Sequence, residues 1–486
     1  MTAVTLSTNT GAPINAMGVR SRIVFLLARL VPNLLGVVTA AVLTRLLKPG
    51  EYGLYALALS IISFLTIGVF EWLALSLLRM APTAEQPSLF FGTVLTCFWT
   101  LCGLSISVTA LVLVLAGLQN YAFLSTACLV ATFAAAWFEL KQRLQLAELR
   151  ETDYFWASTG RGALTITFVC AASYFYGTAS VIILVLATSF FAASFIRREP
   201  RLNFRNVQFD ISASLPLLRF GLPLSISIGL GSMLGSVDKW LLQGLSGPQA
   251  VGLFSAAAIV AQTPLMALAG GIGPLAYSMA VQALEFRSLE EARAQLAQNF
   301  TILLGIAAPS AAGIIALSDN LAHLMVGAAY WQSVIHLTPW LSAAAMLATV
   351  RMYYVDIAFQ LAHRTSRLIW TNLITAVANI ALDIWLIPKL AELGAAISSF
   401  SVSCISLTVA AIASIGVFRL PIPLVDTAKV MLSTGIMFLL LQEFAGFSGI
   451  LALAFQVGAG FLIYVSGLVA FNVLGVRGRL IQHLSR

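Results

Sequence analysis

Long apolar stretches separated by short polar breaks run through the whole chain of 486 residues. A helix that crosses a bilayer needs about 20 apolar residues, and stretches of this length recur fourteen times. The predicted spans are 23–46, 53–78, 89–117, 121–139, 155–175, 178–196, 213–236, 250–282, 299–317, 334–361, 368–387, 393–416, 428–445 and 449–474. The pattern predicts an all-α polytopic membrane protein with about 14 transmembrane helices and a lower limit of 12.

The composition agrees with a membrane protein and excludes a soluble one. The chain is 59% hydrophobic and 9% charged, with a mean hydropathy of +0.94, so it has too few charges to cover a water-exposed surface. A net charge of +8 is also found in nucleic-acid-binding proteins. However, the cytoplasmic loops of membrane proteins collect Lys and Arg, and we therefore predict no nucleic-acid partner.

The positions of Lys and Arg predict the orientation of the spans. If the N-terminus is cytoplasmic, 19 of the 27 basic residues lie in inside segments. The outside turns hold four, Arg45, Lys48, Lys239 and Lys389, and four more lie within spans or at their edges, Arg29, Arg161, Arg219 and Arg351. This bias predicts that both termini are cytoplasmic.

One outer turn occurs twice in the chain. The stretch "LTRLLKPGEYGLYALALS" and the stretch "LLQGLSGPQAVGLFSAAA" align at an offset of 199 residues, with Pro49 matching Pro248 and Gly53 matching Gly252. Six spans separate the copies, and because six is even, both halves enter the membrane in the same direction. Such duplication is typical of secondary transporters, with the substrate site between the halves. A chance similarity between two helix–turn–helix segments is the alternative.

The repeat and a basic polar segment divide the chain into four parts. We predict an N-terminal six-helix lobe at 1–196, a cytoplasmic linker at 197–212 and a C-terminal six-helix lobe at 213–416. Two extra helices and a basic cytoplasmic tail follow at 417–486.

Two stretches resemble a known family. "LTRLLKPGEYGLYALALSIISF" is similar to the first outer turn and second helix of bacterial polysaccharide flippases, the Wzx-type exporters of the multidrug/oligosaccharidyl-lipid/polysaccharide superfamily. "LLRFGLPLSISIGLGSMLGSVDKWLLQGLSGPQAVGLFSAAAIVAQ" resembles their seventh and eighth helices. The segment "VFEWLALSLLRM" departs from the family pattern, in which the end of the second helix is more apolar.

The resemblance implies two six-helix lobes around a central cavity in the bacterial inner membrane. It implies movement of undecaprenyl-diphosphate-linked oligosaccharide to the outer leaflet, for surface or exopolysaccharide biosynthesis, by alternating access coupled to an ion gradient. The expected partners are this lipid-linked substrate, membrane lipids, and the polysaccharide polymerase and chain-length machinery.

The sequence supports other functions less well. A multidrug or organic ion exporter of the same superfamily would need acidic charge to attract cations, whereas the buried excess here is basic and suits an anionic lipid head-group. A peptidoglycan-precursor flippase remains an alternative. We predict no enzyme, because no soluble domain and no paired catalytic carboxylates are present. The five cysteines form no CxxC pair or Cys/His cluster, so neither a metal site nor a cofactor is predicted.

Buried arginines are the candidates for binding the lipid diphosphate, since a guanidinium gives two parallel hydrogen bonds to phosphate oxygens. The predicted substrate-binding residues are Arg29 and Asn33 on the first span, Arg161 within "STGRGALT", and Arg351 on the tenth span. The small neighbours of Arg161 would leave room for a ligand. Snorkelling, internal ion pairing and, for the small residues, close helix packing are the alternatives.

Two intramembrane carboxylates are candidates for ion coupling. Asp356 lies close to Arg351 in the sequence, and Asp383 shares a helix face with Asn379. Charged groups are costly within the membrane and mark ion pathways in many pumps. The alternative is that both aspartates balance the charge of the arginines.

Overall fold

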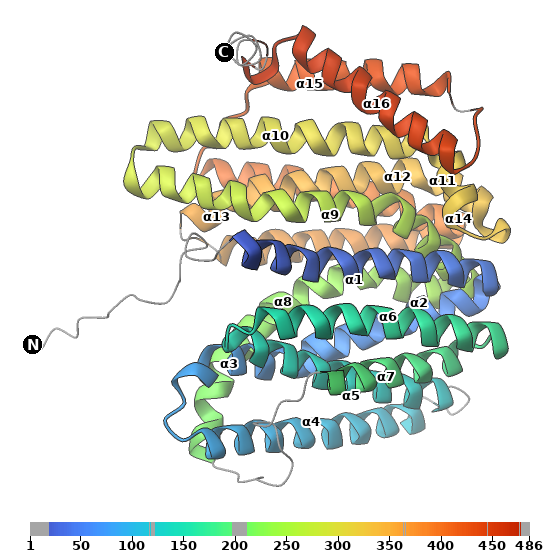
Figure 1. Cartoon of the computed structure of the whole chain (residues 1–486), viewed down its shortest axis with the longest axis vertical. Helices are drawn as coiled ribbons and strands as arrows, with labels where there is room; N and C mark the ends of the chain where they lie inside the picture. Colours follow the sequence, from blue (N-terminus) through green and yellow to red (C-terminus); the bar gives the residue numbers. More distant parts are fainter. Residues whose placement is uncertain are drawn as a thin grey trace, which may run out of the picture. The chain divides into compact units, whose positions relative to one another are not determined.

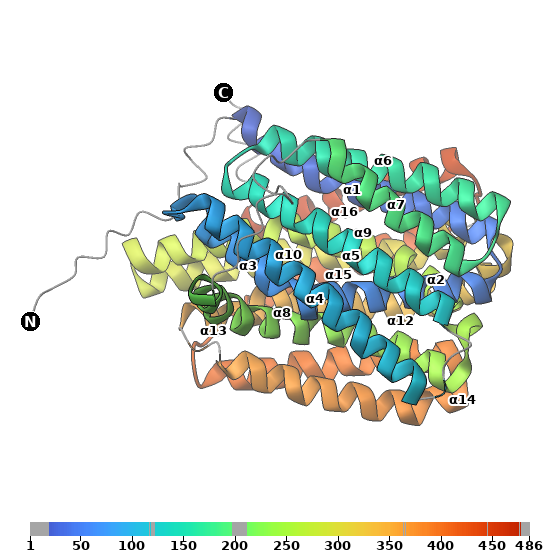
Figure 2. The ribbon, with the colours of Figure 1, turned by 90° about the horizontal axis from the view of Figure 1, so that it is seen from below.

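A computed structural model describes residues 19–115, 117, 122–196, 211–362, 364, 366–444, 446–475 and 477 (Figures 1 and 2). Within these ranges the chain is helical and contains no strand. The helices of the first half are α1 (Val19–Leu46), α2 (Pro49–Leu65), α3 (Glu71–Met80), α4 (Pro87–Leu115), α5 (Ala122–Ala147), α6 (Glu151–Phe175) and α7 (Ala179–Ile196). The second half contains α8 (Ile211–Ser246), α9 (Pro248–Phe286), α10 (Leu289–Ala316), α11 (Ser318–Met325), α12 (Trp331–Val350), α13 (Asp356–Leu361), α14 (Ser366–Ile415), α15 (Leu424–Gln442) and α16 (Ile450–Ala470).

The predicted all-α polytopic class is confirmed, and each of the fourteen predicted spans falls on a helix. Ten helices of the described residues are long and apolar enough to cross a membrane, and two shorter apolar helices occur at Val31–Leu46 and Ser214–Ile226. The 50-residue α14 contains a kink at Ala391, where φ is 48°. It therefore accounts for two predicted spans, the eleventh and the twelfth.

The chain forms two compact units whose borders do not follow the sequence. The first contains the described residues of Met1–Thr39, Leu65–Ala171 and Ile183–Ser225. The second contains those of Ala40–Phe64, Ala172–Ile182 and Ile226–Arg486. The second unit thus includes short pieces of the first half as well as most of the second half. The four-part division of the sequence stays a prediction.

The core of the first unit forms where α3 packs between α4 and α5. Phe70, Leu73, Leu77 and Leu95 are almost fully buried there, and burial of each apolar side chain contributes about 1.5–3 kcal/mol. A π-helical segment, Thr66–Phe70, joins α2 to α3. Such a segment leaves a backbone carbonyl without its usual helical partner.

The first part of α8 packs on this segment of the first unit. The Ser225 hydroxyl donates a hydrogen bond of 2.9 Å to the carbonyl of Ile67. One turn away, Gly221 lies so close to α3 that a Cβ would be 2.0 Å from the Trp72 carbonyl oxygen. Ser225 and Gly221 are small residues one turn apart on α8, and their contacts are those of close helix packing.

In the second unit, α9, α10 and α12 pack side by side and α14 packs on α12. The ring of Tyr354 is buried against that of Phe300, with 4.6 Å between centroids. A second π-helical segment, Arg351–Val355, joins α12 to α13. Tyr353 in this segment fills the space beside Gly273 of α9, where a Cβ would be 2.0 Å from the Tyr353 ring.

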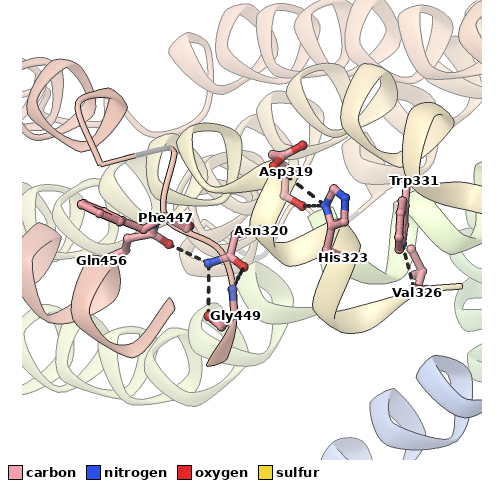
Figure 3. A network of polar contacts seen from close by, with 8 residues as sticks. All are labelled: Asp319, Asn320, His323, Val326, Trp331, Phe447, Gly449 and Gln456. Atoms are coloured by element: carbon pink, nitrogen blue, oxygen red, sulfur yellow. Dashed lines mark hydrogen bonds and ion pairs between the residues drawn. The ribbon is translucent and has the colours of Figure 1, made fainter. Parts of the chain in front are cut away.

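A buried polar network fixes α16 to the short helix α11 in the second unit (Figure 3). The amide of Asn320 donates to the Gln456 side-chain oxygen at 2.9 Å and accepts from the Gly449 backbone N–H at 3.0 Å. Gln456 is fully buried and donates to the Phe444 carbonyl at 2.7 Å. Since each of these buried polar groups has a partner, the network holds α16 in a defined position.

Candidate functional site

The second unit contains an acidic cluster around the buried Asp383, formed by Asp238 of α8 with Asn379, Asp383 and Ser399 of α14. The Asn379 amide nitrogen donates to Asp238 Oδ1 at 2.9 Å and to Asp383 Oδ2 at 3.3 Å. The Ser399 hydroxyl donates to Asp238 Oδ2 at 2.8 Å. Asp383 is fully buried, and its Oδ1 accepts no hydrogen bond from the described residues. A single amide group therefore bridges two carboxylates.

The kink in α14 assembles this acidic cluster. Pro388 and Ala391, the latter with its positive φ, interrupt the helix between Asp383 and Ser399. After the kink the chain turns back on itself, and a Cβ on Gly394 would lie 2.5 Å from the Leu386 carbonyl oxygen. The two arms of α14 consequently present Asp383 and Ser399 to the same point.

Two carboxylates that share one amide donor repel each other in a medium of low dielectric constant, and here Asp383 is fully buried while Asp238 is half-buried. A proton on one of them or a bound cation removes this repulsion. Ser398, fully buried next to Asp383, adds a further oxygen. The cluster supplies carboxylate and hydroxyl oxygens together with an amide, which are the groups found around coupling ions in transporters.

In the first unit, Arg161 of α6 lies between two aromatic rings. Its Cζ is 5.7 Å from the ring centroid of Phe138 on α5 and 5.2 Å from that of Phe190 on α7. The rings stabilise the guanidinium by cation–π interaction, and the negative charge of Glu139 also acts on it. Within the described part of the chain, no hydrogen bond or ion pair is formed by this side chain.

The glycines that flank Arg161 serve helix packing. A Cβ on Gly160 would lie 2.3 Å from Ile196 Cδ1, and a Cβ on Gly162 would lie 2.8 Å from Leu35 Cδ1. The expectation that these small residues leave room for a ligand is therefore not met, because α7 and α1 occupy that space.

Arg29 and Asn33 both lie on α1. The side chain of Arg29 is outside the part of the chain that the structure describes. Asn33 is exposed, and nothing lies within 4 Å of the Cβ position of Gly36 on the same face. The binding role of Arg29 and Asn33 stays a prediction.

Arg351 and Asp356 form an internal pair in the second unit. Arg351 Nε lies 3.6 Å from Asp356 Oδ1, and the guanidinium also donates to Ser406 and Asn372 of α14. The side chain of Arg351 is only 11% exposed. These contacts are those expected if Arg351 serves an internal ion pair. Asp356 therefore belongs to a different polar group from Asp383, which accepts a hydrogen bond from Asn379.

Sequence reasoning missed Asp238, Ser398 and Ser399. Asp238 stands beside Lys239 at the end of a predicted span, where a charged pair suggests a solvated turn. The serines lie beyond the kink, and no local pattern indicates that they face Asp383. The spacing of four residues between Asn379 and Asp383 was the one available signal, because it places both on one helix face.

A second ion pair, in the first unit, was also unexpected. Arg143 of α5 contacts Glu71 of α3 and Glu139 of its own helix, with nitrogen–oxygen distances of 2.8 Å in both cases. Glu71 is 6% exposed. It lies within "VFEWLALSLLRM", the segment that departs from the family pattern, and its buried charge is balanced by Arg143.

The fold is that of known transporters. The lipid II flippase MurJ in an inward closed conformation has a TM-score of 0.75 at 15% identity, over 93% of this chain and 99% of that one. An inward-facing multidrug resistance MATE family transporter of the MOP superfamily has a TM-score of 0.61 at 15% identity, over 81% of this chain and 98% of that one. A MOP superfamily transporter from Pyrococcus furiosus has a TM-score of 0.51 at 14% identity, over 82% of this chain and 95% of that one.

No curated protein matches the chain in sequence. One family model does, that of the polysaccharide biosynthesis proteins, over residues 19–280. This match covers more than half of the chain and includes both copies of the repeated turn. It agrees with the resemblance to Wzx-type flippases, and the chain is a multi-pass membrane protein that belongs to the polysaccharide biosynthesis protein family.

Proposed function

We propose that this protein moves undecaprenyl-diphosphate-linked oligosaccharide repeat units across the bacterial cytoplasmic membrane, for the synthesis of a surface or secreted polysaccharide. The family supports a role in polysaccharide biosynthesis. The observation that carries the proposal for a diphosphate substrate is Arg161, whose guanidinium is held by Phe138 and Phe190 without an ion-pair partner among the described residues.

Arg161 supports an anionic substrate for a physical reason. A guanidinium inside a membrane protein is normally paired, since an unpaired charge is costly there. The two aromatic rings reduce this cost while the N–H donors stay available. A diphosphate would then accept paired hydrogen bonds from the planar fork. An organic cation, the substrate class of many drug exporters, would be repelled from this position.

We further propose that the acidic cluster of Asp238 and Asp383 binds the coupling ion. The support is that the buried Asp383 and the half-buried Asp238 share one amide donor. Occupation by a proton or a monovalent cation neutralises their repulsion, so an ion gradient changes the stability of the conformation that holds this cluster together. Asp356 is a weaker candidate, because Arg351 already balances its charge.

Transport of a peptidoglycan precursor is the second candidate. It is favoured by the similarity in fold to the lipid II flippase MurJ. Lipid II and lipid-linked repeat units share the polyprenyl diphosphate group, so Arg161 fits either substrate. The family match favours the polysaccharide repeat unit.

Deletion of the gene distinguishes these functions. We expect loss of one surface or secreted polysaccharide, together with accumulation of its lipid-linked repeat unit inside the cell. Lipid extraction and mass spectrometry of the diphosphate-linked species measure this directly. Accumulation of lipid II would identify the peptidoglycan precursor as the substrate, and normal export of all polymers in a strain without a paralogue would refute the proposal.

A further inference from the structure

An apolar groove of about 360 Å³ lies on the first unit, between the middle parts of α4, α5 and α7. Its walls include the rings of Trp99, Trp137 and Phe191, and the buried Ala134 and Ala187 form its base. Thr188 contributes a hydroxyl, which donates a 2.7 Å hydrogen bond to the Val185 carbonyl of its own helix. The groove therefore has the size of a ligand pocket and an almost wholly apolar lining.

The groove opens on a surface that meets the membrane. Trp99 is 51% exposed and Phe191 is 55% exposed, both on helices that are long and apolar enough to cross a bilayer. Only 11% of the most apolar part of α4 is buried, and this helix lies along the edge of its unit (Figure 1). A sugar or phosphate group could not replace its lost hydration in such a groove. Hydrocarbon chains are the molecules that fit it.

A positive charge marks one end of the groove. Val130, Ala134, Trp137 and Lys141 follow each other on one face of α5 at spacings of three and four residues. Lys141 thus lies about 6 Å beyond Trp137 along the helix, at 1.5 Å per residue. Its ammonium group donates to the carbonyl of Ser194 on α7, three residues after Phe191. The α5 and α7 walls of the groove therefore run toward this lysine.

We propose that the groove is a specific site for an anionic phospholipid, with one acyl chain against Trp99, Trp137 and Phe191 and with the phosphate at Lys141. The charge of Lys141 complements the phosphate, and the apolar lining complements the chain. The predicted orientation places this end of α5 at the cytoplasmic side, where anionic lipids attract basic residues close to the membrane. The site is independent of the substrate interpretation of Arg161.

Native mass spectrometry of the purified full-length protein tests this proposal. The probes are phosphatidylglycerol and phosphatidylcholine with identical oleoyl chains. We expect one phosphatidylglycerol to bind at least tenfold more tightly than phosphatidylcholine. Ala187→Leu fills the groove and should abolish this tight binding. Ala110→Leu adds the same atoms at an exposed position of α4 and should leave it unchanged.

Lys141→Gln tests the contribution of the charge separately from that of the apolar groove. This variant should bind phosphatidylglycerol and phosphatidylcholine equally, because the chain site remains and the charge is lost. Equal binding of the two lipids by the wild type, or unchanged binding in Ala187→Leu, would overturn the proposal. Displacement of the bound phosphatidylglycerol by equimolar undecaprenyl phosphate would also overturn it, since the groove would then belong to the transported lipid. Thermal unfolding of each variant shows that a loss of binding is not a loss of fold.

Discussion

Gly53 and Gly252, 199 residues apart in the sequence, lie backbone to backbone in the second unit. A Cβ on Gly53 would be 1.7 Å from the Pro248 carbonyl oxygen, and a Cβ on Gly252 would be 2.0 Å from that of Pro49. Each glycine therefore approaches the first residue of the helix that carries the other. This reciprocity is expected when two equivalent turns of a duplicated chain meet across a local two-fold axis.

The contact is reinforced by neighbouring residues of the same unit. The Tyr330 hydroxyl donates to the Leu47 carbonyl at 3.0 Å, and its ring meets that of Tyr52 edge to face. Gly327 lies so close to the end of α1 that a Cβ would be 2.2 Å from the Thr44 carbonyl oxygen. Three glycines thus allow backbones from the two halves of the sequence to pack without intervening side chains.

Gly53→Ala should destabilise the protein by about 1–3 kcal/mol or more, because the added methyl group cannot be accommodated without moving a backbone. Gly50→Ala is the matched control. It lies in the same turn, nothing lies within 4 Å of its Cβ position, and alanine favours the helix. Thermal unfolding in detergent measures both variants. Equal melting temperatures would show that the two turns do not pack as described.

Arg161→Ala should accumulate normally and lose most polysaccharide export, because the guanidinium that lies between Phe138 and Phe190 is removed. Arg161→Lys should recover only part of the export, since an ammonium keeps the charge and loses the planar fork. The control is Arg219→Ala, at an exposed position of α8. Export is measured as cell-surface polymer per molecule of transporter. Wild-type export in Arg161→Ala would assign this arginine a purely structural role.

Asp383→Asn should abolish the dependence of transport on an ion gradient while leaving the protein folded. The substitution keeps the shape of the side chain and removes the buried one of two neighbouring negative charges, so the melting temperature should not fall. Transport into proteoliposomes, with and without imposed proton and sodium gradients, gives the readout.

Asp426→Asn serves as the control for this variant, since Asp426 pairs with Lys429 at 3.6 Å on α15, away from the cluster. If Asp383→Asn responds to both gradients as the wild type does, the acidic cluster has no part in coupling.

Arg143→Ala should destabilise the first unit by roughly 1–3 kcal/mol, less than the 3–5 kcal/mol typical of a fully buried pair, because the arginine side chain is 26% exposed. The loss comes mainly from leaving Glu71 buried without its partner. The double variant Glu71→Gln/Arg143→Ala should consequently be more stable than Arg143→Ala alone. Thermal unfolding of the two single variants and the double variant completes the cycle, and strictly additive effects would contradict a coupled pair.

The apolar periodicity of the chain was enough to predict the helices. Whether a stretch can span a bilayer depends on its own length and hydrophobicity, and both are local properties. All fourteen predicted spans therefore match helices, including the two that α14 joins across its kink. The repeated Pro-Gly turn is equally visible in the sequence, since it needs only a comparison of the chain with itself.

The partners of the charged residues were decided by the tertiary structure. Asp383 was identified as a candidate from its helix face, but Asp238 lies 145 positions before it and Ser399 lies beyond the kink. Arg351 and Arg161 both lie within predicted spans, yet Arg351 is bound by Asp356, Asn372 and Ser406 while Arg161 lies between two aromatic rings. A buried charge is stabilised by the atoms that packing brings within a few ångströms, and helix packing joins residues that the sequence keeps far apart.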